Sequence, residues 1–278
     1  MRRLFSFLVV GALALGATGC LQKVEGTGRQ QFLITSAEQE NQLGAQAYGE
    51  VLATEKPSTD PEGNAMIQRV GKRLAAVAPD RGFQYEFTLI ESEQMNAFCL
   101  PGGKVAFYTG ILPLCQNEAG IATVMGHEIA HAIARHGGER MTQGQLAAGA
   151  QALLGTYLQT QEYTPEVSQL ASAAFGIGLN VAAILPFSRK HELEADELGL
   201  QYMAMAGYDP AEGVKFWERF GQVAGGDAGG VQKYLSTHPA TGDRAEAFRQ
   251  QMPKAQALYA KAPEKHGAGA PVPARFRK

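Results

Sequence analysis

The chain has 278 residues, of which 45% are hydrophobic and 19% are charged, and its formal net charge is −2. This composition is typical of one large globular domain or two small ones and excludes a wholly disordered chain. The slight acidic excess and the lack of a basic tract exclude nucleic acid as an expected partner.

The first twenty residues predict an export signal that ends at a cysteine. Two arginines precede an apolar run over residues 4–15, and small residues lead to Cys20. The segment ATGC is similar to a bacterial lipobox, so residues 1–19 are expected to be a lipoprotein signal peptide and Cys20 the site of lipidation. A plain cleaved signal with an incidental cysteine is the alternative.

Residues 20–35 are polar and contain glycine, as expected of a tether between a lipid and a domain. The ordered domain is expected from Ser36, which has capping-box spacing with Gln39. The apolar residues that follow share one face of a helix: Leu43, Ala47 and Val51.

A second helix is expected after Asp60, which is an N-cap followed by Pro61 at the first helical position. Its apolar stripe consists of Ile67, Val70, Leu74 and Val77. Residues 83–90 alternate between apolar and polar side chains, which predicts a half-buried strand. The following run, 96–110, turns about Pro101 and predicts a β-hairpin or an interrupted strand, so the sheet is small.

Cys99 and Cys115 are the two cysteines that remain after Cys20. In an exported chain such a pair can form a disulfide bond. Two buried free thiols are the alternative, and the sequence leaves this choice open.

From Asn117 onward the chain is expected to be mainly helical, which gives an α+β fold with one domain over residues 36–260. Residues 117–140 are apolar on nearly every face and predict a helix buried inside the domain. Residues 143–186 predict a helical hairpin that ends at Pro186 and forms a packed pair or a lid. Its apolar stretch, residues 170–185, is interrupted by Asn180 and is too short for a membrane span. The remaining predictions are helices over 188–206, 210–223 and 241–260, and a disordered tail over 261–278.

The tract GHEIAH, residues 126–131, predicts a metal site. On a helix His127 and His131 lie one turn apart on one face, so both rings can reach one ion. Glu128 lies beside them and can take a proton from an attacking water and pass it to the leaving amine. A histidine pair satisfied within the core is the alternative. A metzincin is excluded, because its third histidine would stand at Gly137.

A third ligand is expected from the tract SRKHELEADELG, residues 188–199. Glu192 and Asp196 are four residues apart, so Glu192 can bind the metal while Asp196 holds a ligating histidine in one tautomer. His191 and Glu194 point to other faces and are expected to be solvated or structural. An exposed charged helix is the alternative interpretation of the tract.

Together these motifs resemble the M48 family of zinc metallopeptidases over roughly residues 36–250. The resemblance rests on four tracts: NAFCLPGGKVAFYTG, GHEIAHAIARHGGER, SRKHELEAD and STHPATGDR. It implies a zincin-like (gluzincin) domain that holds one Zn²⁺ on His127, His131 and Glu192, with Glu128 as the general base. Periplasmic lipoproteins that act in outer-membrane quality control are the members most similar to this chain.

The resemblance leads us to expect a zinc endopeptidase that degrades extended or misfolded envelope proteins. Two alternatives are a chaperone-like lipoprotein with latent proteolysis and a zinc hydrolase of cell-wall peptides. Expected partners are extended polypeptides, a membrane through the N-terminal lipid, and the outer-membrane assembly machinery. Leu21 stands where inner-membrane lipoproteins commonly have aspartate, so the expected location is the periplasmic leaflet of the bacterial outer membrane.

Two tracts are expected to contact substrate. An edge strand at Val105, Ala106 and Phe107 would pair with the substrate backbone, and a core strand without a free edge is the alternative. His238 in STHPATGDR would donate to the oxyanion or, as the resemblance suggests, bind the metal and keep the site inactive; a helix cap is the third possibility. Arg244 would steady this loop or bind substrate carbonyls.

Overall fold

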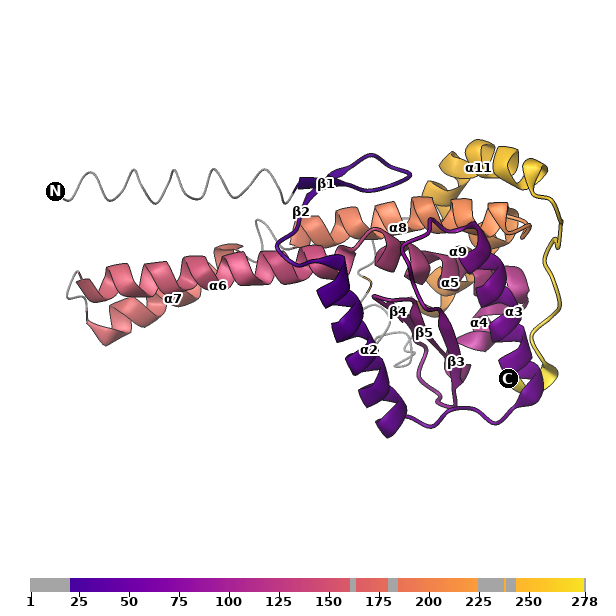
Figure 1. Cartoon of the computed structure of the whole chain (residues 1–278), viewed down its shortest axis with the longest axis horizontal. Coiled ribbons are helices and arrows are strands. Elements are labelled where there is room, and N and C mark those ends of the chain that lie inside the picture. Colours follow the sequence, from indigo (N-terminus) through magenta and orange to yellow (C-terminus); the bar gives the residue numbers. More distant parts are fainter. Residues whose placement is uncertain (1–20, 161–163, 180–184, 225–237, 239–243, 278) are drawn as a thin grey trace.

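The centre of the domain is helix α5 (Glu118–Ile133), all of whose residues are buried. The computed structural model describes residues 21–160, 164–179, 185–224, 238 and 244–277 (Figure 1). The Asn117 side chain accepts a hydrogen bond from Gly120 N and caps the start of α5. Helix α5 packs most extensively against α8 (Leu185–Met205), so the predicted buried helix is confirmed.

Two glycines allow α5 and α8 to approach each other closely. A Cβ atom on Gly199 would lie 2.6 Å from His127 N, and one on Gly126 would lie 2.9 Å from Gly199 O. Neither helix has room for a side chain at this crossing. The close approach brings the HEIAH tract of one helix against the ELEAD tract of the other.

A three-stranded sheet lies beside α5, in the order β3 (Glu86–Ile90), β5 (Lys104–Tyr108), β4 (Ala97–Leu100). Strands β3 and β5 are parallel, and β4 and β5 form the predicted antiparallel hairpin. The turn uses Gly102 and Gly103, with φ of 83° and 82°, conformations that glycine adopts without strain. A short 3₁₀ turn, η2 (Thr109–Ile111), and α4 (Leu112–Cys115) connect β5 to α5.

The prediction of β5 as the edge strand is wrong. Strand β5 pairs on both sides, and Val105, Ala106 and Phe107 are buried. The strand beside α5 is β4, which pairs only with β5 among the described strands. Strand order depends on contacts between distant parts of the chain, which the local alternation of residues does not contain.

Helices α2 (Ala37–Thr54) and α3 (Pro61–Val77) begin at the predicted caps. Ser36 and Gln39 form the capping box of α2, and the Asp60 side chain accepts from Gly63 N in α3. In α3 the predicted stripe is buried except for Val77, which is half-buried. In α2 the predicted face is wrong by one position, because Leu43 is 51% exposed. The buried residues are Glu40, Gly44 and Tyr48.

The region predicted as a tether is part of the domain. Strands β1 (Leu21–Lys23) and β2 (Gln30–Phe32) form an antiparallel hairpin, and Val24 and Leu33 are buried. Arg29 forms ion pairs with Glu139 and Glu194. Burial of these apolar side chains and pairing of this charge hold the segment on the domain, so the prediction of an independent tether is wrong.

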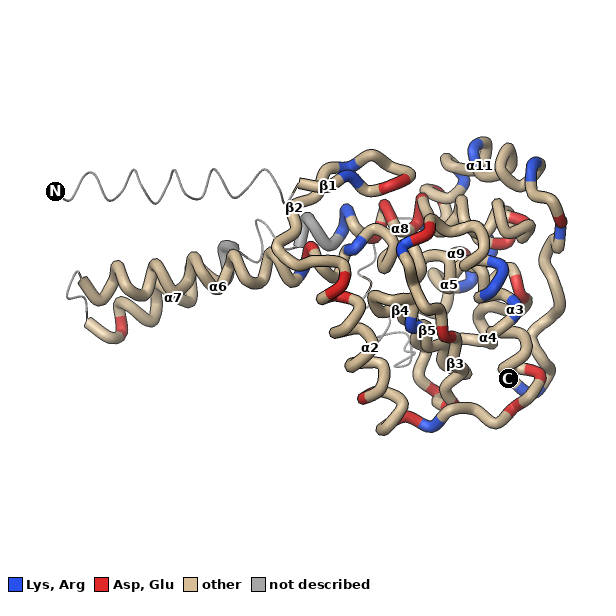
Figure 2. Tube along the Cα trace, viewed as in Figure 1, with Lys and Arg blue, Asp and Glu red and all other residues tan. Residues whose placement is uncertain are grey.

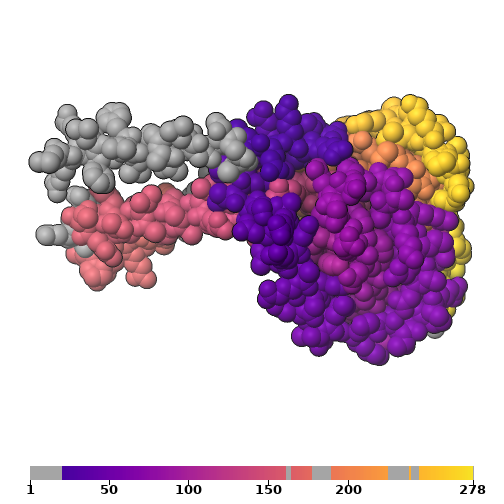
Figure 3. Space-filling view, viewed as in Figure 1, coloured from indigo at the N-terminus to yellow at the C-terminus, as the bar shows by residue number. Residues whose placement is uncertain are grey.

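Helices α6 (His136–Thr160) and α7 (Pro165–Leu179) form the predicted pair as an arm that extends away from the domain (Figures 1 and 3). Glu166 is the one charged residue in 141–160 and 164–179 (Figure 2). Pro186 does not end the arm but lies in the first turn of α8, where proline is tolerated. Within the described residues, no helix combines the length and apolarity that a bilayer crossing requires.

The C-terminal segment is ordered, so the prediction of a disordered tail is wrong. Helices α9 (Ala211–Ala224) and α11 (Arg244–Lys261) contact each other, and the chain then runs across α5 and α3 to η4 (Ala274–Phe276). Val272 is fully buried, and its N–H donates to Gln116 O. Arg275 forms ion pairs with Asp60 and Glu62. These contacts offset the entropy lost by ordering a segment rich in Pro, Ala and Gly.

Cys99 and Cys115 are both free thiols, which decides between the two alternatives that the sequence left open. Cys99 lies within β4, opposite Val105, whereas Cys115 is fully buried at the end of α4. They belong to separate elements of the core, and burial raises the pKa of both thiols.

Candidate metal centre

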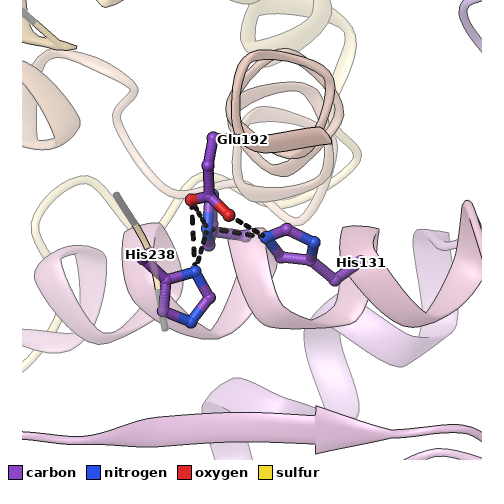
Figure 4. Close-up of side chains that lie close together, drawn as sticks. His131, Glu192 and His238 are labelled. Atoms are coloured by element: carbon purple, nitrogen blue, oxygen red, sulfur yellow. Dashed lines mark hydrogen bonds and ion pairs between the residues drawn. The ribbon is translucent and has the colours of Figure 1, made fainter. Parts of the chain in front are cut away.

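Four side chains converge where α5 crosses α8. One ligand atom each from His127, His131, Glu192 and His238 lies within 4.8 Å of all the others, and all four side chains are buried. Glu192 points from α8 toward the rings of His131 and His238 (Figure 4). The sequence predicted the first three as the ligand set, and the structure brings them together with His238.

The distances inside the cluster suit one shared ion. His131 Nε2 lies 3.0 Å from His127 Nε2. The Glu192 carboxylate lies 3.3 Å from His127 Nε2 through Oε2 and 3.4 Å from His131 Nε2 through Oε1. Polar atoms of this kind that face one another in a buried space are costly without a partner, and a cation between them would satisfy all three.

Asp196 and Arg244 lie behind His127. Asp196 Oδ1 is 2.9 Å from His127 Nδ1, as expected of the group that fixes a ligand's tautomer. Arg244 Nε donates to Asp196 Oδ2 at 2.8 Å, and the guanidinium stacks 3.6 Å from the centre of the Trp217 ring. Arg244 is buried and its guanidinium is bonded to Asp196. The structure therefore does not support the prediction that Arg244 binds substrate carbonyls.

His131 has a different neighbour on its far side, which the sequence analysis missed. His136 Nδ1 lies 2.8 Å from His131 Nδ1. The chain returns because Arg135, with φ of 57°, breaks the helix between α5 and α6. Five residues along a straight helix would have placed His136 on another face. Its place five residues after the last histidine of the HEIAH tract was the available signal.

The network continues into charged residues that were expected to be solvated or merely structural. His136 Nε2 lies 2.9 Å from Glu194 Oε2, and His191 Nε2 lies 2.9 Å from Glu139 Oε2. All four side chains are buried, so of the two roles expected for His191 and Glu194 the solvated one is wrong and the structural one agrees with their buried contacts. Arg29, from the N-terminal hairpin, pairs with both carboxylates, and nothing in its local sequence indicated this.

The electrostatics of the cluster favour a cation. Burial would raise the pKa of Glu192, but hydrogen bonds with three histidine rings hold it well below its ordinary value. Burial lowers the pKa of His131 to about 3. A neutral imidazole and an ionised carboxylate are the forms that bind metal. Although burial lowers it, hydrogen bonds to Asp196 and Glu192 raise the pKa of His127 to about 9, so metal must displace a proton there.

His238 and Glu128 lie on the side of the cluster away from Asp196. His238 Nδ1 is 3.1 Å from Glu192 Oε2 and 3.3 Å from His127 Nε2. His238 Nε2 is 3.4 Å from Glu128 Oε1. That oxygen is buried and accepts no hydrogen bond from any residue that the structure describes, and burial raises the pKa of Glu128. An unsatisfied carboxylate beside the cluster suits a group that handles a proton.

Two imidazoles and a carboxylate on crossing helices, with a second buried carboxylate adjacent, define a metallopeptidase of the zincin type. The sequence profile of Peptidase family M48 matches residues 61–252. The mitochondrial metalloendopeptidase OMA1 of Schizosaccharomyces pombe is 35% identical over 240 residues, which cover 85% of this chain and 68% of that protein. The OMA1 of Saccharomyces cerevisiae is 31% identical over 274 residues, 92% of this chain and 76% of that protein.

A bacterial relative matches as well. The beta-barrel assembly-enhancing protease of Escherichia coli is 27% identical over 221 residues, which cover 78% of this chain but 44% of that protein. The chain therefore belongs to peptidase family M48. The expected enzyme class, a zinc metalloendopeptidase, and the zincin-like α+β fold are confirmed.

The expected location is contradicted by these relatives. The two yeast proteins, which cover most of this chain, are named mitochondrial, so the prediction of a bacterial outer-membrane leaflet is wrong. That prediction depended on a few residues around Cys20. Targeting signals are short segments that receptors recognise, and the fold of the domain does not constrain them. Cys20 lies outside the described residues, and its lipidation stays a prediction.

Proposed function

We propose that this protein is a zinc-dependent endopeptidase that cleaves extended or misfolded polypeptides. The observation that carries the proposal is the buried cluster of His127, His131 and Glu192 with the unsatisfied Glu128 carboxylate beside it. Nitrogen and carboxylate donors in this number are the protein ligands of catalytic zinc. The donor set therefore fits zinc.

The residues divide the chemical work between them. A bound zinc ion would act as a Lewis acid and make water a better nucleophile near neutral pH. Glu128 would accept the proton of the attacking water on Oε1 and transfer it to the nitrogen of the leaving amine. Asp196 keeps the proton of His127 on Nδ1, so that Nε2 faces the cluster, and Arg244 holds Asp196 in place.

Strand β4 is the proposed binding edge for substrate. The O atom of Asn96 accepts from Tyr108 N. Because hydrogen-bonded pairs alternate along an antiparallel ladder, the backbone polar groups of Ala97 and Cys99 point away from β5. An extended peptide added there would gain main-chain hydrogen bonds with little dependence on its side chains. This supports activity on unfolded chains and resistance of folded ones.

His238 is proposed as a resident fourth ligand rather than an oxyanion donor. Its ring lies between Glu192 and Glu128, where an attacking water and a substrate carbonyl would otherwise be placed. A zinc site whose fourth position is filled by protein is a structural rather than a catalytic one. His238 must therefore leave before substrate binds, and its departure would switch the enzyme on.

The biological role of the enzyme is proposed from its relatives and its motifs. Partnership with a machinery that assembles β-barrel proteins is proposed from the name of the Escherichia coli relative, a beta-barrel assembly-enhancing protease. Quality control of misfolded envelope proteins is proposed from the resemblance of the four sequence tracts to the family. A lipid on Cys20 is proposed from the motif that precedes it. A chaperone-like protein with latent proteolysis is the second candidate, favoured by the position of His238 over the cluster.

Glu128→Gln tests the proposed function. The variant should retain one zinc per chain, because Glu128 is not a ligand, and should hydrolyse casein at least about 10²-fold more slowly, because the general base is lost. Metal content by atomic absorption and the rate of casein hydrolysis, with and without chelator, are the two measurements. Wild-type protein without zinc, or full activity of Glu128→Gln, would contradict the proposal. If the second candidate is right and the protein binds unfolded chains without cleaving them, wild type and Glu128→Gln will be equally inactive.

A further inference from the structure

We propose that His136 and Glu194, held by Arg29, are positioning residues for the metal ligand His131, and that the hairpin of residues 21–32 is thereby part of the metal centre. The inference rests on the proposed function, since it assigns a role toward the same zinc. It concerns Nδ1 of His131, whose printed partner among the described residues is an imidazole rather than a carboxylate.

A continuous line of contacts joins the N-terminal hairpin to the cluster. His131 Nδ1 lies 2.8 Å from His136 Nδ1, and His136 Nε2 lies 2.9 Å from Glu194 Oε2. Arg29 Nε then donates to Glu194 Oε2 at 2.7 Å. Thr27 also donates to the Glu194 carboxylate. The line therefore passes from the loop that precedes β2, through α8 and the start of α6, to α5.

The contacts of His131 determine which nitrogen of each ring in this line would carry a proton when the site holds a metal. His131 faces His127 and Glu192 with Nε2, so as a ligand it would keep its proton on Nδ1. That proton can be donated only to an unprotonated His136 Nδ1, which places the second proton on His136 Nε2. His136 then donates to Glu194. His127 reaches a carboxylate directly, whereas His131 reaches one through a second imidazole, and either arrangement fixes a ligand's ring and tautomer.

Arg29 makes this arrangement possible by balancing two buried carboxylates. Its Nη1 and Nη2 donate to the two oxygens of Glu139 at 3.0 and 2.8 Å, while its Nε is directed to Glu194. Removing one partner of such a buried group leaves an uncompensated charge. The guanidinium is the cation between these carboxylates, which argues against a second metal ion there.

Stacking fixes the plane of the relaying ring. His136 and His191 lie 4.2 Å apart with an interplanar angle of 12°, and His191 is bonded to Glu139. Both carboxylates that Arg29 joins are thus connected to the His136 ring, one by a hydrogen bond and the other through a stacked neighbour. A displacement of Arg29 would loosen both contacts of the His136 ring, the hydrogen bond to Glu194 and the stacking on His191.

The experiment combines zinc affinity with the tautomer of His131. His136→Phe should weaken zinc binding about 10–100-fold, the range for removing such a partner, measured by competition with a chelator. His136→Asn, which keeps an acceptor near Nδ1, should recover part of the loss. Arg29→Met should weaken binding toward the lower end of that range. In metal-free protein, ¹⁵N NMR should show a single His131 tautomer protonated on Nδ1, and a mixture in His136→Phe.

Arg69→Met is the matched control, because Arg69 also pairs with a buried glutamate, Glu118. Glu118 lies nine residues before His127 on α5, about 13 Å away along the helix. This control should bind zinc like wild type. If Arg29→Met fails to fold, Arg29→Lys keeps the charge but cannot bridge both carboxylates, and the same loss is expected.

The outcomes separate this inference from the proposed function. Wild-type protein that binds no zinc would overturn the function. Wild-type protein that binds zinc, with unchanged affinity and tautomer in His136→Phe, would overturn the inference alone. An equal loss in Arg29→Met and Arg69→Met would also overturn it, because the effect would then reflect general loss of stability.

Discussion

His238 occupies the position in the cluster where two chemical roles compete. As a resident ligand it blocks the site, and as a donor it would stabilise the transition state. We expect His238→Ala to raise the rate of casein hydrolysis severalfold, because the ring that lies 3.1 Å from Glu192 and 3.4 Å from Glu128 is removed. Zinc content should stay at one per chain. A loss of about 10²-fold or more would instead assign the oxyanion role.

Glu139 gives a pH dependence of stability whose sign follows from its partners. Burial acts to raise the pKa of Glu139, but hydrogen bonds from His191 and Arg29 hold it below the ordinary value of 4.5. A depressed pKa adds stability above pH 4.5 that is lost as the pH falls through the lowered value. We expect the free energy of unfolding of wild type to decrease over this range more steeply than that of Glu139→Gln.

Urea denaturation at several pH values below and above 4.5 measures this difference. Glu139→Gln should be less stable than wild type at neutral pH, and the two proteins should approach each other in acid. Parallel curves would show that the ion pair with Arg29 contributes nothing to folding.

Among single residues, the sequence predicted those whose relation is local. His127, His131, Glu192 and Asp196 follow from four-residue spacing, which a helix converts directly into a shared face. His136 was missed because the positive φ of Arg135 breaks that regularity. Arg29 was missed because its partners are more than one hundred residues away in the chain.

At the level of elements, the crossing of α5 and α8 determines whether ligands on different helices meet. We expect Gly199→Ala to reduce zinc content and to lower the free energy of unfolding by about 1–3 kcal/mol, the range for overpacking. The added Cβ would lie 2.6 Å from His127 N, and backbone on both sides cannot yield easily. Metal analysis and urea denaturation provide the two measurements.

The control for this prediction is Gly221→Ala on α9, where an added Cβ meets nothing within 4 Å. Alanine is the better helix former by up to about 1 kcal/mol, so this variant should be as stable as wild type or more so. Zinc binding by Gly199→Ala equal to that of the control would show that the helices can separate without disturbing the ligands.

The helices were easier to predict from the sequence than the order of the strands in the sheet. The caps at Ser36 and Asp60 and the buried stripe of α3 depend on residues three or four apart. The order of β3, β5 and β4 depends on a parallel pairing between β3 and β5, which are separated in the chain by β4. That pairing turned the expected edge strand into the central one.

Across the whole molecule, apolar side chains are distributed unequally between the domain and the arm. Leu153 and Leu170 of the arm are 74% and 73% exposed, whereas Leu74 of α3 is fully buried. We expect Leu153→Ser and Leu170→Ser each to change the free energy of unfolding by less than about 0.5 kcal/mol. Leu74→Ala should lower it by about 2–5 kcal/mol. Urea denaturation distinguishes these outcomes, and a large effect in the arm would show that its exposed face is packed in solution.

The N-terminal hairpin has a practical consequence for where a recombinant version of the enzyme begins. The helical pattern starts at Ser36, which makes that residue an inviting boundary for a shortened protein. Such a protein would lack Arg29 and would leave Glu139 and Glu194 facing each other without their shared cation. It would bind zinc more weakly than the longer protein and would be less active at limiting zinc, although each residue of its HEIAH tract was intact. A shortened protein that begins at Leu21 keeps the hairpin and avoids this false negative.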